Sequence, residues 1–413
     1  MFQGTGKIMT KVFLALFAST TLALIASDAY AQDKTVKIGV LTDNSGLFSD
    51  LGGVGSTLAA QMAVEDSGLA AKGWTIDVIS ADHQNKPDVA TNIGRQWIDV
   101  KKVDVFADVL SSGVALAISN LAKQKNVILL ASGSATSDLT NAQCSPNTIH
   151  WTYDTYMVAK GTGQALVRAG YNSWFFLVVD FAFGYAVERD ASAVVVKEGG
   201  KVLGSVRHPL NTSDFSSYLL QAQASKAKVI GLANAGGDSI NTIKQASEFG
   251  IVAGGQHLAG LLLFINDIHS LGLEAAQGLY LTETFYWDLN DSTRAFSKRF
   301  SERMKTKAEP SMIQAGVYSS LIHYFKALEA MGGNPHDGAK VVAKMKEMPT
   351  DDPLFGKGSI RADGRKIHPA YLFQVKKPEE SKGPWDYYKL ISTTPGDQAF
   401  RPLSESECPL VQK

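Results

Sequence analysis

Short loops rich in glycine, serine and threonine contain the residues of this sequence that could bind or transform a small molecule. In "LLASGSATSDLT", residues 129–140, an apolar run ends abruptly in small residues that bear hydroxyl groups. Four more loops share this character, namely "TDNSGLFSDLGGVGS", "ADVLSSGVA", "VVDFAFGYA" and "LANAGGDS". Each leads into a predicted helix, and the first N–H groups of a helix lack internal partners and favour an anion. We therefore expect Gly133 to Ser137 to form a bed of hydrogen-bond donors for a small carboxylate.

Patterns that would support catalysis, a metal or a nucleotide are incomplete. None of the eight histidines pairs at i, i+4 or within an HExxH motif, so we expect no metal site. The loop Gly52–Thr57 lacks the lysine of a phosphate-binding loop, and "ASGSAT" lacks the GxSxG spacing of a nucleophile elbow. The sequence therefore predicts a binding protein without a cofactor rather than an enzyme. The enzymatic alternative is a secreted hydrolase that uses Ser111 or Ser134.

The N-terminus has the pattern of a secretory signal peptide. Lysines precede an apolar run over residues 12–25, which is followed by the small-residue motif Ala29-x-Ala31. The run is too short to span a bilayer as a membrane anchor. We expect residues 1–31 to be a signal peptide that is cleaved after Ala31, and the mature protein to be periplasmic.

Composition and cysteine count narrow the protein class further. Lys plus Arg and Asp plus Glu are balanced at 40 each, so no basic surface predicts nucleic-acid binding. The two cysteines, Cys144 and Cys408, are too few for a zinc or iron–sulfur site. Because an even count in an exported chain favours a disulfide, we expect these two cysteines to pair.

Two α/β units are expected because short apolar runs alternate with stretches of helical periodicity. The apolar runs are continuous, which is typical of a parallel sheet covered by helices on both faces. The predicted strands span residues 36–41, 75–80, 103–107 and 127–130 in the first unit, and 174–179, 202–207, 229–233 and 258–263 in the second. The predicted helices span residues 53–67, 86–99, 114–124, 185–198, 215–224, 239–249, 293–305 and 312–331.

The expected fold class is α/β with two lobes, each a doubly wound parallel sheet flanked by helices. We assign residues 32–155 and 285–352 to lobe 1, and residues 156–284 and 353–413 to lobe 2, joined by a hinge of about three crossings. Open parallel sheets bind ligands beyond the carboxyl ends of their strands. The glycine- and serine-rich loops follow predicted strands, so we expect them to line a cleft between the lobes.

The order and spacing of these loops resemble a known family. "IGVLTDNSG", "VLSSGVA", "LLASGSATSDLT", "VVDFAFGYA" and "QGLYLT" follow one another as in periplasmic solute-binding receptors of ABC importers, of the branched-chain amino acid (Leu/Ile/Val-binding) type. The resemblance covers residues 36–375. It implies a two-lobed type I fold and a monomer that holds a small-molecule carboxylate in its cleft. It also implies delivery of that ligand to an ABC permease in the inner membrane.

The resemblance implies which residues contact the ligand. The matched positions of lobe 1, which would hold the carboxylate and cover the ligand, are Phe48, Leu51, Ser111, Ser112, Gly133, Ser134 and Ala135. Those of lobe 2, together with an aromatic residue expected near the cleft, are Asp180, Phe183, Asn234, Gly236, Leu261 and Phe285. Asp180 either meets a ring hydroxyl of the ligand or caps the helix that follows it.

One departure from the family pattern bears on the ligand. Amino acid receptors place an acid in lobe 2 to meet the ligand's ammonium, and Leu261 stands nearest to that place here. A buried ammonium without a partner is costly, so we expect an aromatic acid such as a hydroxybenzoate or a phenylpropenoate. "TETFYWDLND" also resembles the aromatic-acid branch of the family. The alternatives are an amino acid receptor in which Asp180 or Asp267 serves the ammonium, and a ligand-binding sensor that signals to a membrane kinase.

Overall fold

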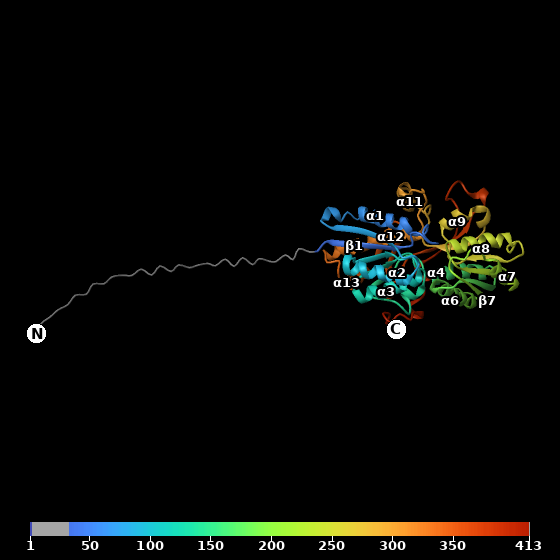
Figure 1. Cartoon of the computed structure of the whole chain (residues 1–413), viewed down its shortest axis with the longest axis horizontal. Coiled ribbons are helices and arrows are strands. Elements are labelled where there is room, and N and C mark those ends of the chain that lie inside the picture. The colour runs from blue at the N-terminus through green and yellow to red at the C-terminus, as the bar shows by residue number, and fades with distance from the viewer. Residues whose placement is uncertain (2–32, 413) are drawn as a thin grey trace. The chain divides into compact units, whose positions relative to one another are not determined.

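The computed structural model describes residue 1 and residues 33–412. The expected signal peptide and its cleavage after Ala31 lie outside the described residues. Among the residues that are described, no helix is both long and apolar enough to cross a membrane. The described residues from Asp33 onward form one compact unit, and its elements are labelled in Figure 1.

Five parallel strands form the sheet of lobe 1, in the order β2-β1-β3-β4-β5. The strands are β1 Thr35–Thr42, β2 Thr75–Asp82, β3 Val105–Asp108, β4 Ile128–Ala131 and β5 Thr148–His150. Every residue of β3 and β4 is buried, because helices cover both faces of the sheet. The helices on one side are α1 Gly53–Ser67, α11 Asp291–Arg303, α12 Met312–Met331 and α13 Gly338–Glu347. Those on the other side are α2 Pro87–Gln96 and α3 Ser112–Lys125 (Figure 1).

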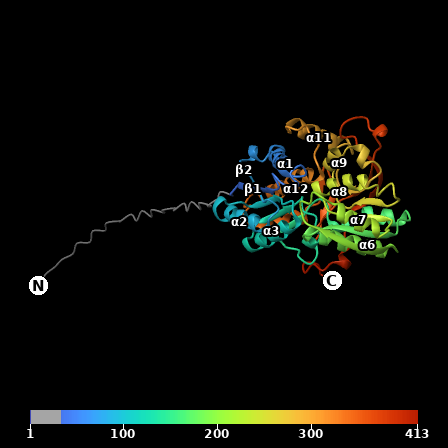
Figure 2. The ribbon, with the colours of Figure 1, turned by 45° about the vertical axis from the view of Figure 1, so that its right-hand side comes forward.

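Four parallel strands form the sheet of lobe 2, in the order β7-β6-β8-β9. The strands are β6 Ser173–Val179, β7 Lys201–His208, β8 Val229–Ala233 and β9 His257–Gly260. The surrounding helices are α6 Ala182–Lys197, α7 Ser216–Ala224, α8 Gly237–Glu248, α9 Ile265–Leu271 and α10 Leu273–Ala276 (Figure 2). The expected strand over residues 258–263 is wrong in its second half, because β9 ends at Gly260.

Short elements make up much of the chain outside the two parallel sheets and their helices. They are α4 Thr155–Val158, a π-helical turn Ala159–Gly163, α5 Gln164–Arg168, β10 Tyr280–Glu283, β11 Thr350–Asp352, β12 Gly356–Ile360, β13 Lys366–Ile367, β14 Ala370–Val375 and β15 Tyr388–Thr394. β10, β14 and β15 form one antiparallel sheet, and β11 to β13 form another. The expected lobe boundaries stay a prediction. A bridge between His150 and Arg365 joins residues next to β13 to the sheet of lobe 1, which favours placing residues 353–367 with that lobe.

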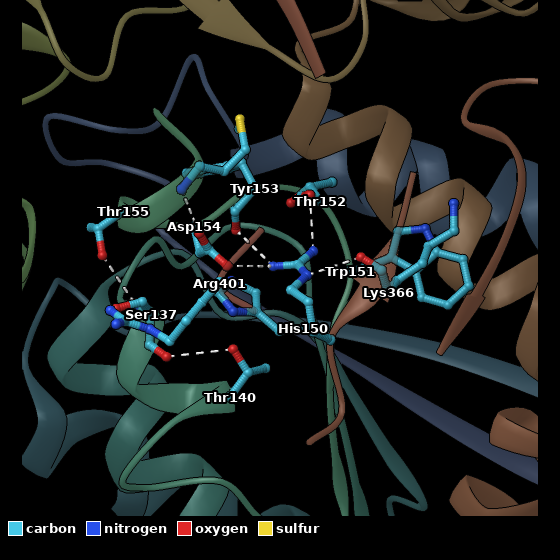
Figure 3. Close-up of polar contacts among 12 residues, drawn as sticks. Ser137, Thr140, His150, Trp151, Thr152, Tyr153, Asp154, Thr155, Lys366 and Arg401 are labelled. Atoms are coloured by element: carbon cyan, nitrogen blue, oxygen red, sulfur yellow. Dashed lines mark hydrogen bonds and ion pairs between the residues drawn. The ribbon is translucent and has the colours of Figure 1, made fainter. Parts of the chain in front are cut away.

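A buried arginine holds the first crossing segment. The guanidinium of Arg365 donates to the carbonyl oxygens of Tyr153 at 3.1 Å and Thr152 at 2.9 Å. It also pairs with the carboxylate of Asp154 at 3.5 Å. Thr152, Tyr153 and Asp154 of this segment lie together in Figure 3. Both charged side chains are almost fully buried, so removing either one would leave an uncompensated charge in the protein interior. These contacts fix residues 152–154, which include the cavity residue Tyr153 described below.

The C-terminal segment is attached to both lobes. Cys144 and Cys408 form the expected disulfide, which joins residues 264 positions apart in the sequence. We call residues 396–412 the C-terminal strap. Arg401 of the strap pairs with Asp190 of α6 in lobe 2 at 3.1 Å, whereas Cys144 belongs to lobe 1. The strap therefore bridges the two lobes beside the crossing segments.

Candidate functional site

A small cavity of about 20 Å³ lies where the loops of the two lobes meet, at the carboxyl ends of the strands. Open parallel sheets place their ligands at this position. The lining residues of lobe 1 are Phe48, Leu51, Leu110, Ser111, Ser112, Gly133, Ala135, Tyr153 and Ile313. Those of lobe 2 are Phe181, Phe183, Ala235, Leu262 and Phe264.

The loop after β3 presents Ser111 and Ser112 to the cavity. Asp108 and Val109 adopt a left-handed backbone, with φ of 74° and 53°, and such strain in residues other than glycine is common at functional sites. The hydroxyl of Ser112 accepts from the N–H of Thr136 at 3.2 Å, which brings the loop after β4 alongside. Ser111 is the N-cap residue of α3, yet its hydroxyl makes no capping hydrogen bond. This hydroxyl is therefore available to a ligand at the start of a helix.

The loop after β4 is held by its carbonyl groups. The hydroxyl of Tyr153 donates to the carbonyl oxygen of Gly133 at 2.6 Å, and the ring of His150 donates to that of Ser134 at 2.8 Å. In a trans peptide the N–H points opposite to the carbonyl, so the N–H groups of Ser134 and Ala135 point away from these partners. Neither N–H has an acceptor among the described residues, and an unpaired buried N–H is rare. Two main-chain donors are thus available to an anion.

The rest of the cavity is apolar and largely aromatic. The rings of Phe181 and Phe183 lie with their centroids 6.0 Å apart. Phe264 meets Tyr153 edge to face at 5.7 Å between ring centroids. These rings pack against one another and form an apolar wall on which a ring or a short aliphatic chain can pack. The cavity therefore combines hydrogen-bond donors on one side with apolar surface on the others.

The lobes touch at Phe48, which lies in the loop after β1. The carboxylate of Asp43 accepts from the N–H groups of Gly46 at 2.7 Å and Phe48 at 3.1 Å and so fixes this loop. Gly236, just before α8 of lobe 2, packs so closely that an added Cβ would lie 2.7 Å from the carbonyl oxygen of Leu47. The same Cβ would lie 2.9 Å from a ring carbon of Phe48. This contact shuts one side of the cavity.

A family model described as periplasmic binding protein matches residues 35–384 of the chain. The chain belongs to this family. A periplasmic binding protein from Burkholderia mallei is 49% identical, with 92% of this chain and 100% of that chain covered and a TM-score of 0.88. A branched chain amino acid ABC transporter periplasmic ligand-binding protein from Burkholderia xenovorans is 40% identical, with 91% and 100% covered and a TM-score of 0.81. An ABC transporter solute binding protein from R. palustris, in complex with benzoate, shares the fold at 20% identity, with 88% and 97% covered and a TM-score of 0.77.

Family membership confirms the expected two-lobed type I fold and the role of a periplasmic solute-binding protein of an ABC transporter. The relatives are binding proteins, which confirms the expectation that the chain is not an enzyme. Among residue 1 and residues 33–412, no group of three or more His, Cys, Asp or Glu side chains could hold a metal ion.

Several residues expected from the sequence line the cavity of this binding protein. They are Phe48, Leu51, Ser111, Ser112, Gly133, Ala135 and Phe183. Ser134 lies in the same loop but does not line the cavity; its side chain is buried, and its main-chain N–H has no acceptor among the described residues. Gly236 shapes the cavity through its contact with Phe48 rather than by lining it.

The remaining expected residues lie elsewhere in lobe 2 or in the core. Asp180 is exposed and accepts a hydrogen bond from the hydroxyl of Tyr185, and it does not cap α6, whose N-cap residue is Phe181. The amide nitrogen of Asn234 donates to Thr242 at 3.1 Å, so its side chain serves the inside of lobe 2. Leu261 and Phe285 do not line the cavity either.

Leu261 is buried beside the cavity, and its neighbour Leu262 lines the wall instead. The ring of Phe285 packs in the core, 6.2 Å from the ring of Phe355. The sequence reading missed the lining residues Leu110, Leu262, Phe264 and Ile313. Ile313 carried no local signal, because it lies on α12, far along the chain from the loops that it faces.

Three buried acids lie near the cavity without lining it. Burial raises the pKa of Asp108 to about 6, that of Asp267 to about 7 and that of Glu283 to about 8. In each acid, hydrogen bonds from nearby hydroxyl or N–H groups partly oppose this shift. The carboxyl of Asp267 accepts from the N–H of Phe264 at 3.0 Å, and that of Glu283 accepts from the hydroxyl of Tyr388 at 2.7 Å. Neither acid of lobe 2 therefore presents a carboxylate to the cavity wall.

Proposed function

We propose that this binding protein captures a small monocarboxylate with an apolar, preferably aromatic, body and delivers it to an ABC permease. The observation that carries the proposal is the division of the cavity into two kinds of surface. Among the residues that the structure describes, the hydroxyl of Ser111 and the N–H groups of Ser134 and Ala135 have no hydrogen-bond partner. A carboxylate bound there would receive charge-assisted hydrogen bonds, which are about twice as strong as neutral ones.

The apolar walls supply the rest of the affinity. Burying the body of the ligand against Phe181, Phe183 and Phe264 would contribute about 25 cal/mol for each Å² of apolar surface removed from water. The benzoate complex of the R. palustris protein supports the proposal, because it places a ring carboxylate within the same fold. Hinge motion of the two lobes would enclose the ligand, as is usual for proteins that bind between domains.

An amino acid receptor is the second candidate, because the B. xenovorans relative is described as a branched chain amino acid protein. The ammonium of an amino acid would need a buried counter-charge. Of the two acids that the sequence suggested, Asp180 is exposed and Asp267 accepts from the N–H of Phe264 at the start of α9, and neither lines the cavity.

Isothermal titration calorimetry on the mature protein tests the choice between these candidates. The panel contains benzoate, phenylacetate, cinnamate, 3-methylbutanoate, leucine and phenylalanine. We expect the carboxylates without an ammonium to bind and the two amino acids to bind at least a hundredfold more weakly. Tight binding of leucine that is lost in the Asp267→Asn variant would overturn the proposal in favour of the amino acid receptor.

A further inference from the structure

We infer that the cavity discriminates against hydroxyl groups on the body of its ligand, and this inference rests on the proposed function. Its preferred ligands are monocarboxylates whose body is wholly apolar. The specificity-determining surface is the wall formed by Phe181, Phe183, Ala235, Leu262 and Phe264 of lobe 2. None of these side chains bears a nitrogen or oxygen atom. A ligand that directs its carboxylate toward lobe 1 presents the far end of its body to this wall.

Of the polar side chains beside the wall, Asp180 is exposed and accepts from Tyr185, and two others are engaged in buried hydrogen bonds. The hydroxyl of Tyr153 donates to the carbonyl oxygen of Gly133 at 2.6 Å. Asn234, adjacent to Ala235, uses its amide oxygen to accept from Ser239 at 2.7 Å and its amide nitrogen to donate within lobe 2. Turning either side chain toward a ligand would break a buried hydrogen bond.

The lining hydroxyls of lobe 1 are engaged or belong to the carboxylate side, and the carboxyl of Asp108 is buried outside the lining. Ser112 accepts from the N–H of Thr136 at 3.2 Å, and Ser111 stands with the donors that would hold the carboxylate. Main-chain N–H groups at the start of α6 are donors, so they leave the hydrogen of a ligand hydroxyl without an acceptor. A ring hydroxyl would therefore lose its hydrogen bonds to water and form only part of the corresponding hydrogen bonds with the protein.

The size of the expected discrimination follows from that loss. A hydrophobic pocket rejects a group of equal size that bears a hydroxyl by up to about a hundredfold. We expect 4-hydroxybenzoate to bind about 10- to 100-fold more weakly than 4-methylbenzoate, which has the same shape. The same ratio is expected between 3-hydroxybutanoate and 3-methylbutanoate, so the inference is testable with ring and chain ligands alike.

The test is calorimetry of both pairs on the wild type and on the Leu262→Asn variant. Leu262→Asn places a donor and an acceptor on the wall at nearly constant side-chain length, so the methyl-to-hydroxyl ratio should fall at least fivefold. Leu220→Asn, on the exposed surface of α7, is the matched control and should leave the ratio unchanged.

The outcomes separate the inference from the proposed function. A wild-type ratio of tenfold or more that shrinks in Leu262→Asn supports both. Equal or tighter binding of the hydroxylated partners overturns the inference and leaves the proposed function standing. If none of the four carboxylates binds, the proposed function fails and the inference fails with it.

Discussion

Replacing Gly236 by alanine should weaken ligand binding as well as the fold. The added methyl group would meet the carbonyl oxygen of Leu47 at 2.7 Å and the ring of Phe48 at 2.9 Å. Both neighbours belong to lobe 1, whereas Gly236 belongs to lobe 2, so the clash arises only when the lobes are together. The substitution therefore opposes the arrangement that encloses the ligand.

Two separate costs can be estimated. Overpacking a closed contact costs about 1–3 kcal/mol, which corresponds to an affinity about 5- to 140-fold lower at 1.4 kcal/mol per tenfold change. Gly236 also has a φ of 58°, and a residue with a Cβ in that region is strained by about 1–3 kcal/mol. The strain lowers the free energy of unfolding whether or not the ligand is present.

Gly250→Ala is the matched control. Gly250 has a φ of 65°, and an added Cβ there meets no atom within 4 Å. Thermal unfolding should show a loss of stability in both variants, and calorimetry with the tightest carboxylate of the panel should show a loss of affinity only in Gly236→Ala. Wild-type affinity in a folded Gly236→Ala protein would refute the reasoning, because the contact of Gly236 with Phe48 would then be absent from the bound form.

Three further predictions follow from the site and the strap. Ser111→Ala should weaken carboxylate binding by about 10- to 100-fold, since hydrogen bonds to charged groups contribute about 1.5–3 kcal/mol. Calorimetry checks this, with the exposed Ser217→Ala variant as control. Unchanged affinity in Ser111→Ala would exclude Ser111 from the site. Asp108 has a pKa of about 6 when folded and an ordinary value of 3.8, so the native state holds its proton more tightly. The wild type should therefore lose about 3 kcal/mol of stability as the pH rises from about 4 to about 6. Asp108→Asn should abolish that part of the pH dependence in denaturant titrations, and parallel curves for the two proteins would contradict the assignment. Replacing Cys144 and Cys408 by serine should lower the free energy of unfolding by about 2–5 kcal/mol, because the long loop that they close regains its entropy in the unfolded chain; equal unfolding midpoints would show that the bond adds nothing.

The parallel-sheet architecture could be predicted because its signals are local. Continuous apolar runs marked the strands, and the helices Gly53–Ser67 and Met312–Met331 were predicted with their observed bounds. β5 and α13 were missed. β5 has only three residues, which is too short for a periodic pattern, and strand pairing rather than composition defines it.

The sequence predicted the cavity residues of lobe 1 better than those of lobe 2. Ser111 and Gly133 follow buried strands directly, so their position at the sheet edge is set by the strand ends. In lobe 2 the apolar run after Ala259 was read as a strand, but the chain leaves the sheet at Gly260. The run therefore turns, and Leu262 rather than Leu261 reaches the cavity. Asp180 directly follows a strand and was therefore expected at the cavity. It is exposed instead and accepts a hydrogen bond from Tyr185, which lies in the first turn of α6.

The C-terminal strap ties the two lobes together at a place away from the cavity. It is covalently tied to lobe 1 at Cys144 and ion-paired with α6 at Asp190. Among the described residues, none of its hydrogen bonds or ion pairs involves a residue that lines the cavity. We therefore expect the strap to restrain the lobes beside the crossings, and the larger displacement on opening to fall at the rim formed by Phe48 and Gly236. A fluorescent reporter should therefore be attached at that rim, while the tail serves as the anchoring point for immobilisation on a sensor surface.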